Sequence, residues 1–391
     1  MMNENFQFKI SAGPHNRYFC PVELTIPTEQ FDSSKSKCLK ELHTGRLIPI
    51  QIVPTSDKSQ AKIAWLVDEL RAYSERHYAV VDGSPGKGAA GVSLIENKTE
   101  SALEIYIDNQ FFTRYNFDKN YSKPFLYPII GPYGANITRH YPMKQNVPGE
   151  TTDHIHHRSI YTSHGDMNGS DNWSEEEGHG HIVHTKIMGC LSGTIFGEFI
   201  AENEWQNASG QPIVREQRRI RAYWQPSDRR ILDYEVTFFA DWEDVRFGDT
   251  KEGGILSVRV ASSMDAVKDG RIENAHGGVS EAETWGKRAV WCDYSGPVED
   301  RWQGIALFDH PDNFRHPTYW HVRDYGLMTA NPFGLSHFKN DKTWDGSYVL
   351  KKGGSLRFLY RIYIHSGNVQ DGGVKERYFD FIHPIIRDKS R

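Results

Sequence analysis

Short segments in which apolar and polar residues alternate recur along the chain, and this pattern is typical of half-buried β-strands. The segment VREQRRIRAYW, which ends at Trp224, shows the alternation most clearly. We expect strands at residues 6–10, 21–26, 47–53, 61–67, 102–108, 111–117, 193–207, 213–224, 230–242, 255–263, 288–296, 303–310 and 355–367. Segments of this length, separated by Gly, Pro, Asn and Asp turns, predict large antiparallel sheets packed face to face.

Helical periodicity is scarce. VKERYFDFIHP (374–384) predicts one short terminal helix, whereas KIAWLVDELRAYSERHYAVV (62–81) has a helix-like middle but is expected to form a strand, a turn and a strand. The Gly-rich DGSPGKGAAG (82–91) is typical of a linker and lacks the spacing of a phosphate-binding loop. We predict an all-β protein, with a small N-terminal β domain at 1–95 and a large antiparallel β-sandwich at 96–391.

Composition narrows the class of protein. Hydrophobic residues make up 38% of the 391 and charged residues 25%, which is typical of a globular protein with a real core. The net charge of −5 and the lack of a Lys/Arg block argue against nucleic acid or an anionic membrane as a partner. No apolar stretch is long enough to span a membrane, and the N-terminus lacks the pattern of a signal peptide, which favours the cytoplasm.

Cysteine and aromatic content add two expectations. The four cysteines, Cys20, Cys38, Cys190 and Cys292, form no CxxC pair, so we expect reduced thiols rather than a disulfide framework. Aromatic residues reach 13%, which favours strands and also supplies flat surfaces for ligands such as sugar rings. The oligomeric state is not indicated.

The most unusual segment is DHIHHRSIYTSHGDMNGSDNW (153–173), which begins a stretch holding seven of the 18 histidines. On a strand, His154, His156 and Arg158 would share one face and His157 would lie on the other. Histidines at i and i+2 can converge on a metal, so His154 and His156 are candidate ligands of a divalent cation. A third ligand would come from His164, His179, His181 or His184. The alternative is buried, hydrogen-bonded histidines.

The second half of this segment predicts a binding loop. Two glycines interrupt any regular element, so His164, Asp166 and Asn168 are expected on a loop, where binding groups are often carried. Trp173 is a candidate platform for a sugar ring or else a core residue. His157 and His164 compete for an acid–base role, because the pKa of histidine lies near neutral pH, while Arg158 would bind substrate oxygens.

Two further clusters carry candidate chemistry. FDHPDNFRHPTYWHVRDYGLMTANPFG (308–334) is Pro-rich and irregular, and it suits a pocket wall that binds hydroxyls and stacks on a ring. Its candidate substrate-binding residues are His310, Arg315, His316, Trp320 and His321. The other cluster is KEGGILSVRV (251–260), with Lys251 and Arg259, in which Glu252 before the glycine pair is the carboxylate to test.

These same motifs carry a resemblance to a family. KPFLYPIIGPYGANITRHYP (123–142), the histidine-rich segment, TKEGGILSVR and above all segment 308–334 resemble the DUF6807 family over about residues 100 to 385. Its members are often named after a methane oxygenase subunit, PmoA, but that subunit needs transmembrane helices, so the name indicates no chemistry here. The resemblance implies a β-supersandwich like that of galactose mutarotases and association with carbohydrate-degrading enzymes. The first 70 residues are similar to the small β domain before the sandwich of some rhamnogalacturonan lyases.

Three functions fit these residues. The first is a carbohydrate-active enzyme, a hydrolase, lyase or dehydratase, that cleaves or rearranges a C–O bond of an oligosaccharide or sugar derivative in a pocket lined by His, Arg and Trp. The second is a metal-dependent enzyme of Lewis-acid or oxygenase type with histidine ligands. The third is a non-catalytic sugar-binding protein, which would leave the many imidazoles unexplained.

Overall fold

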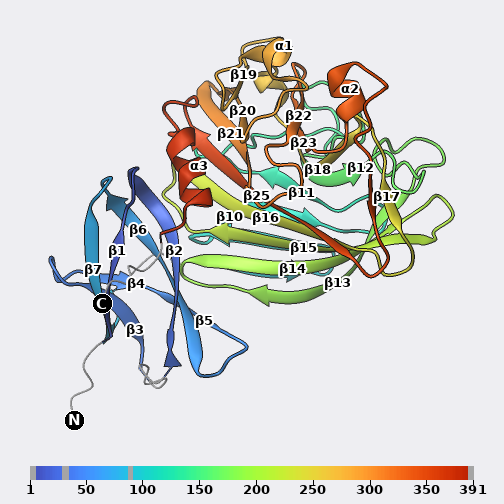
Figure 1. The fold of residues 1–391 in the computed structure, drawn as a ribbon. Helices are drawn as coiled ribbons and strands as arrows, with labels where there is room; N and C mark the ends of the chain where they lie inside the picture. The colour runs from blue at the N-terminus through green and yellow to red at the C-terminus, as the bar shows by residue number, and fades with distance from the viewer. Residues whose placement is uncertain (1–5, 29–34, 87–90, 386–391) are drawn as a thin grey trace.

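Strands dominate the computed structural model, which describes residues 6–28, 35–86 and 91–385 (Figure 1). The predicted all-β class is confirmed, with a small N-terminal β domain followed by a large antiparallel sandwich. The expected strand, turn and strand within residues 62–81 are confirmed by β6 (Gln60–Leu70) and β7 (Glu75–Asp82). The terminal helix is confirmed as α3 (Val374–Ile382).

The N-terminal domain consists of two small sheets that pack on each other. One has the strand order β1-β7-β3-β4 and the other β2-β6-β5. Their remaining strands are β1 (Gln7–Ser11), β2 (Arg17–Pro27), β3 (Lys37–Glu41), β4 (Leu47–Pro49) and β5 (Gln51–Pro54). Phe8, Trp65 and Tyr78 form the aromatic centre between them, with ring centroids 5.6 to 5.9 Å apart.

Two eight-stranded antiparallel sheets form the sandwich. The first has the order β22-β23-β18-β12-β11-β10-β9-β8. Its strands are β8 (Val92–Asn97), β9 (Ala102–Ile107), β10 (Gln110–Asn116), β11 (Phe125–Ile129), β12 (Ile160–His164), β18 (Gly253–Arg259), β22 (Tyr319–Arg323) and β23 (Leu327–Asn331). Because β8 pairs with β9, we propose that the domain boundary lies between β7 and β8.

The second large sheet has the order β13-β14-β15-β16-β25-β21-β20-β19. Its strands are β13 (His181–Leu191), β14 (Phe196–Gln206), β15 (Pro212–Tyr223), β16 (Arg229–Phe239), β19 (Arg271–Asn274), β20 (Trp291–Val298), β21 (Arg301–Asp309) and β25 (Ser355–Ser366). On β16 the alternate residues Tyr234, Val236 and Phe238 enter the core, while Asp233 and Glu235 face away from it. The apolar residues that recur at every second position of the sequence thus form the inner face of the sheet.

Short elements connect the strands of the sandwich. They are β17 (Val245–Phe247), the 3₁₀ turn η2 (Ser262–Met264), α1 (Ser280–Thr284), α2 (Leu335–Lys339) and β24 (Tyr348–Leu350). Cys20, Cys38 and Cys292 are buried free thiols and Cys190 is an exposed one. None of the helices within the described residues has the length and apolar character needed to cross a membrane.

The C-terminal helix fastens the N-terminal domain to the sandwich, and Figure 1 shows α3 between the two. The buried carboxylate of Asp380 lies 3.2 Å from Arg17 Nη1 and 2.6 Å from Arg377 Nε. Arg377 also donates hydrogen bonds to the carbonyl groups of Asn16 and Tyr18. The contacts with Arg17, Asn16 and Tyr18 join residues about 360 positions apart, so the two ends of the chain stabilise each other.

Replacing Asp380 with Asn should lower the free energy of unfolding by about 3 to 5 kcal/mol, because two buried guanidinium groups would lose their shared counter-charge. Urea denaturation measures the loss. Glu376→Gln, on an exposed position of the same helix, is the matched control and should change stability by less than about 0.5 kcal/mol. Equal stability of the two variants would contradict the proposed role of Asp380.

Candidate active site

The predicted strand at 153–158 is wrong, because this segment forms a turn that precedes β12. The backbone N–H of His157 donates to the carbonyl of His154, and His154 has a positive φ of 49°. His154 and His157 therefore stack on the same side, 4.8 Å apart and nearly parallel, instead of lying on opposite faces. The side chain of Ile155 is exposed.

Ion pairs beneath this turn determine its conformation, so the side chains do not alternate between two faces as they would on a strand. The Asp153 carboxylate accepts hydrogen bonds from the fully buried side chains of Arg139 and Arg259. Arg259 Nη1 also donates to His157 Nδ1 over 2.9 Å, which leaves the proton of that neutral ring on Nε2. Burial first, and then the neighbouring positive groups, hold the pKa of His157 well below its usual value.

His156 occupies the edge of the turn. Burial and the Lys123 ammonium lower its pKa to about 4, so the ring is neutral at pH 7. Lys123 donates to the carbonyl of Trp173 and lies 3.3 Å from Glu175, which also binds Arg158 through both carboxylate oxygens. Arg158 is thus held by a protein carboxylate, and this buried cluster supports the turn from behind.

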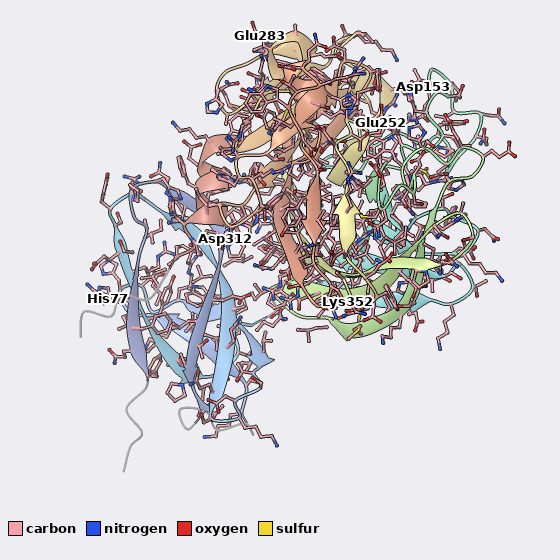
Figure 2. The ribbon with its side chains drawn as sticks, turned by 45° about the vertical axis from the view of Figure 1, so that its right-hand side comes forward. His77, Asp153, Glu252, Glu283, Asp312 and Lys352 are labelled. Carbon is pink, nitrogen blue, oxygen red and sulfur yellow. The ribbon has the colours of Figure 1, made fainter. Side chains whose placement is uncertain are left out.

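Glu252 is a half-buried carboxylate of this region, and Figure 2 shows it at the same end of the sandwich as Asp153. Its side chain is 40% exposed and lies 2.6 Å from Lys251 Nζ. Burial would raise its pKa, but Lys251, together with His321 and His156, brings the pKa below the usual value. Its backbone is fixed, because its carbonyl accepts from Gly165 and its N–H donates to Thr250 Oγ1. Glu252 is therefore a held, ionised carboxylate that can accept a proton.

His321, on β22, is the predicted residue of segment 308–334 that lies beside Glu252. Its Nδ1–H donates to the carbonyl of Lys251 over 2.5 Å, so in the neutral ring Nε2 carries a free lone pair. Burial lowers its pKa, while the hydrogen bond to the Lys251 carbonyl and the charge of Glu252 act in the opposite direction. The geometry supplies a neutral imidazole next to an ionised carboxylate, which is a pair suited to proton transfer.

An open pocket of about 850 Å³ lies near this pair, although neither Glu252 nor His321 is among the residues that line it. Lys251 lines it, and so does Trp285, whose ring lies 6.4 Å from that of His321. The wall combines two tryptophans with charged and polar groups: Arg246, Asp249, Lys251, Trp285, Arg323, Ser336, His337, Asn340, Asp341, Lys342, Trp344 and Asp345. Trp344 is 51% exposed and so presents an aromatic surface to solvent. This mixture suits a polar ligand with an apolar ring face.

The two predicted acid–base histidines lie inside the protein. His157 is 1% exposed and its Nδ1 is occupied by Arg259. His164 is fully buried at the end of β12, not on the predicted loop, and packs on Phe247 and Phe333. Its Nε2–H donates to the carbonyl of Gly248, and burial lowers its pKa to about 4. Neither imidazole reaches the pocket in this structure.

The predicted loop after His164 supports the pocket from outside. Asp166 Oδ2 lies 2.8 Å from Nη1 of Arg246, a residue of the pocket wall. Asn168 donates to Glu243 and Asp244 and accepts from the Arg246 backbone N–H, which fastens the loop to β17. Trp173 is 1% exposed among Phe125 and Tyr161, so it packs in the interior and presents no platform.

The Pro-rich part of segment 308–334 binds other parts of the protein. Its Arg315 lies near the pocket wall: burial lowers the pKa of Arg315, and the charges of Asp249 and Asp345 in that wall act in the opposite direction. His310 packs on Phe381 of α3, and Figure 2 shows the neighbouring Asp312 on the side of the N-terminal domain, away from Glu252. His316 Nδ1–H donates to the buried Asp309 carboxylate over 2.8 Å. Arg315 donates to the carbonyl groups of Pro332, Gly346 and Ser347. Trp320 is fully buried and donates to the Ala289 carbonyl. These four side chains have structural partners.

The candidate metal ligands form no complete set. His154 and His156 lie edge to face with ring centroids 5.7 Å apart, and His154 Nδ1 contacts Asp153. Across residues 6–28, 35–86 and 91–385, no three His, Cys, Asp or Glu side chains are grouped so that they could hold a metal ion. The metal-dependent alternative therefore has no observed donor set in its favour.

Two aromatic residues of the site were missed in the sequence. Tyr325 stacks on His154 at 4.9 Å and lies over Arg259, so it closes the turn. In the sequence, Tyr325 could have been found from its position four residues after His321, in the tight turn that joins β22 and β23. Trp344 stands in the polar segment NDKTWDGS, and an isolated Trp among turn residues marks an exposed aromatic.

The buried neutral histidines predict a pH-dependent stability. Their pKa values in the folded protein, about 4 for His156 and His164, lie below the value of about 6.5 in the unfolded chain. Below pH 6.5 the unfolded state therefore binds more protons, and the free energy of unfolding should fall by about 1 kcal/mol per pH unit per histidine down to pH 4. Urea denaturation at pH 7 and pH 5 measures this.

His164→Asn should reduce the difference in stability between the two pH values, whereas the same change at exposed His43 should leave it intact. A wild-type protein equally stable at pH 7 and pH 5 would show that these imidazoles are not buried in the neutral form.

Comparison with solved structures gives three alignments. A protein in the glycosyl hydrolase family 38 from Enterococcus faecalis is 11% identical with a TM-score of 0.47, over 99% of this chain and 47% of its own. The alpha-galactosidase of Lactobacillus brevis is 9% identical with a TM-score of 0.36, over 74% and 41%. A galactose mutarotase related enzyme from Lactobacillus acidophilus is 9% identical with a TM-score of 0.30, over 71% and 97%. The chain spans less than half the length of the first two.

No curated protein matches the sequence. A family model does match, over residues 102–378, and its description is a family of unknown function, DUF6807. The matched range runs from the start of β9 into α3 and contains the histidine-rich turn, Glu252, His321 and the pocket wall. The resemblance seen in the sequence is thereby confirmed, and the chain belongs to the DUF6807 family.

Proposed function

We propose that this protein is a carbohydrate-active enzyme that cleaves or rearranges a C–O bond of a sugar in the pocket beside Glu252. The observation that carries the proposal is the position of that carboxylate. It is ionised, partly exposed and fixed by its backbone, and its ion-pair partner Lys251 lines a pocket of about 850 Å³ that contains two tryptophans. Aromatic faces beside ion-paired groups suit the apolar and hydroxyl faces of a sugar ring.

The roles follow from the contacts. Glu252 takes a proton from substrate or water, and His321 Nε2 is the neighbouring acceptor through which that proton can be relayed. Lys251 and Arg323 line the same pocket and stabilise negative charge that develops on a substrate oxygen. Trp285 and Trp344 orient the ring. Hydrolysis, elimination and dehydration all require such a transfer, so the products identify the class.

The turn at 153–158 supports this pair. His156 lies near enough for its charge to act on Glu252, and its low pKa keeps it neutral at pH 7. Because His156 is neutral, it adds no permanent positive charge to that of Lys251 beside the Glu252 carboxylate. The carboxylate can therefore act as a base. The buried His157 and His164 are therefore assigned to the support of the site and not to its chemistry.

Glu252→Gln should lower turnover by about 10²- to 10⁴-fold, because the amide cannot accept the proton. Neutral and acidic oligosaccharides and aryl glycosides would be incubated with the wild-type protein, and products would be identified by mass spectrometry. The converted substrate would then be tested with Glu252→Gln. Glu283→Gln on exposed α1, which Figure 2 places apart from Glu252, is the matched control and should keep full activity.

The outcomes separate the alternatives. Unchanged turnover in Glu252→Gln would refute the assigned role of this carboxylate. Binding of sugars without conversion of any of them would instead establish the third hypothesis, a non-catalytic sugar-binding protein.

A further inference from the structure

The cations in the wall of the pocket are already paired with carboxylates. Arg246 Nη1 lies 2.8 Å from Asp166 and Lys251 Nζ lies 2.6 Å from Glu252. Arg323 Nε lies 3.1 Å from Glu281. An anionic ligand would have to displace a protein carboxylate from each cation, and that carboxylate would then stay beside it.

The remaining charges of the wall do not favour an anion either. Lys342 is an exposed lysine at the rim, and it stands among Asp249, Asp341 and Asp345. The backbone N–H groups of Ser336 and Gly346 donate to Asp249, and hydrogen bonds from Thr343 and Ser347 lower the pKa values of Asp341 and Asp345. Asp341 and Asp345 are thus ionised at neutral pH. The residues that line the pocket include four cations, Arg246, Lys251, Arg323 and Lys342, and three carboxylates, Asp249, Asp341 and Asp345. Three of these cations also pair with carboxylates outside the lining, Asp166, Glu252 and Glu281.

A neutral polyol makes better use of this wall. Each hydroxyl both donates and accepts, whereas a carboxylate accepts only. A close ion pair offers an acceptor oxygen and a donor nitrogen within 3.1 Å of each other, so adjacent hydroxyls of a ring can bond to both partners without breaking the pair. The exposed Trp344 supplies an apolar surface for the C–H face of the same ring.

We infer that the pocket binds a neutral sugar, with its ring against Trp344 and its hydroxyls bridging the ion pairs, and that it discriminates against sugars carrying a carboxylate. This inference rests on the proposed function and names the substrate class of that site. The discrimination arises because Arg246, Lys251 and Arg323 already hold protein carboxylates, with which an added carboxylate would have to compete.

Calorimetric titration of the full chain with matched pairs of ligands tests the inference. The probes are gluco-, galacto- and xylo-oligosaccharides and, against them, the corresponding glucuronate and galacturonate oligosaccharides. A neutral probe should bind at least about tenfold more tightly than its acidic counterpart. Its affinity should change less than about twofold between 50 and 500 mM NaCl, because no net charge is neutralised on binding.

Two variants locate the effect. Trp344→Ala should weaken binding of the neutral probe by about tenfold, whereas Trp302→Ala, at another exposed tryptophan on β21, should not change it. Glu281→Gln removes the carboxylate that pairs with Arg323, so it should strengthen binding of the acidic probe by about fivefold and reduce the preference for the neutral probe.

Tighter binding of a uronate than of its neutral counterpart, weakened by salt, would overturn the inference. If that uronate were also converted and Glu252→Gln abolished the conversion, the proposed function would stand while the inference failed. If neither class of sugar bound, both would fail. Binding of the neutral probe that is insensitive to Trp344→Ala would refute the assigned pocket.

Discussion

The Asp153 carboxylate lies between two guanidinium groups that have no exposure to solvent, and the arrangement of the site depends on it. Arg139 and Arg259 come from segments on either side of the turn, so the shared carboxylate ties that turn to β18. Leaving either guanidinium without a counter-charge in the interior would cost several kcal/mol. The turn is therefore fixed, and with it the stacked rings of His154, His157 and Tyr325.

The same network explains why so many histidines can be buried at once. An imidazole is inexpensive to bury only when it is neutral and its N–H has an acceptor or its lone pair a donor. Arg259 satisfies the lone pair of His157, and backbone carbonyl groups accept from His164 and His321. Their lowered pKa values are the consequence of this arrangement and indicate structural support as readily as catalysis.

The sequence predicted most strands of the second large sheet, but it missed the turn and five strands of the first large sheet, β8, β11, β12, β22 and β23. Alternation along segments such as 230–242 specifies an inner face, and β16 forms there because its period matches the pleat. Alternation in DHIHHR predicted a strand, but the segment forms a turn. The ion pairs of Asp153 and the positive φ of His154 depend on residues distant in sequence. Glu252 was identified from the sequence as the carboxylate to test because two glycines follow it. Gly253 leaves the room that the ring of His164 occupies, since a Cβ there would lie 2.6 Å from Nδ1.

At neutral pH, the neighbouring histidines do not determine the ionisation of Glu252. Burial keeps His156 and His321 uncharged, so neither supplies a counter-charge to the carboxylate at pH 7. Lys251 is the cation in contact with it, and its backbone carbonyl also holds His321 Nδ1–H. Lys251 thus influences both the ionisation of Glu252 and the tautomer of His321. Because Lys251 also lines the pocket, the proposed function implies that a sugar hydroxyl in contact with its ammonium acts on the same group that pairs with Glu252.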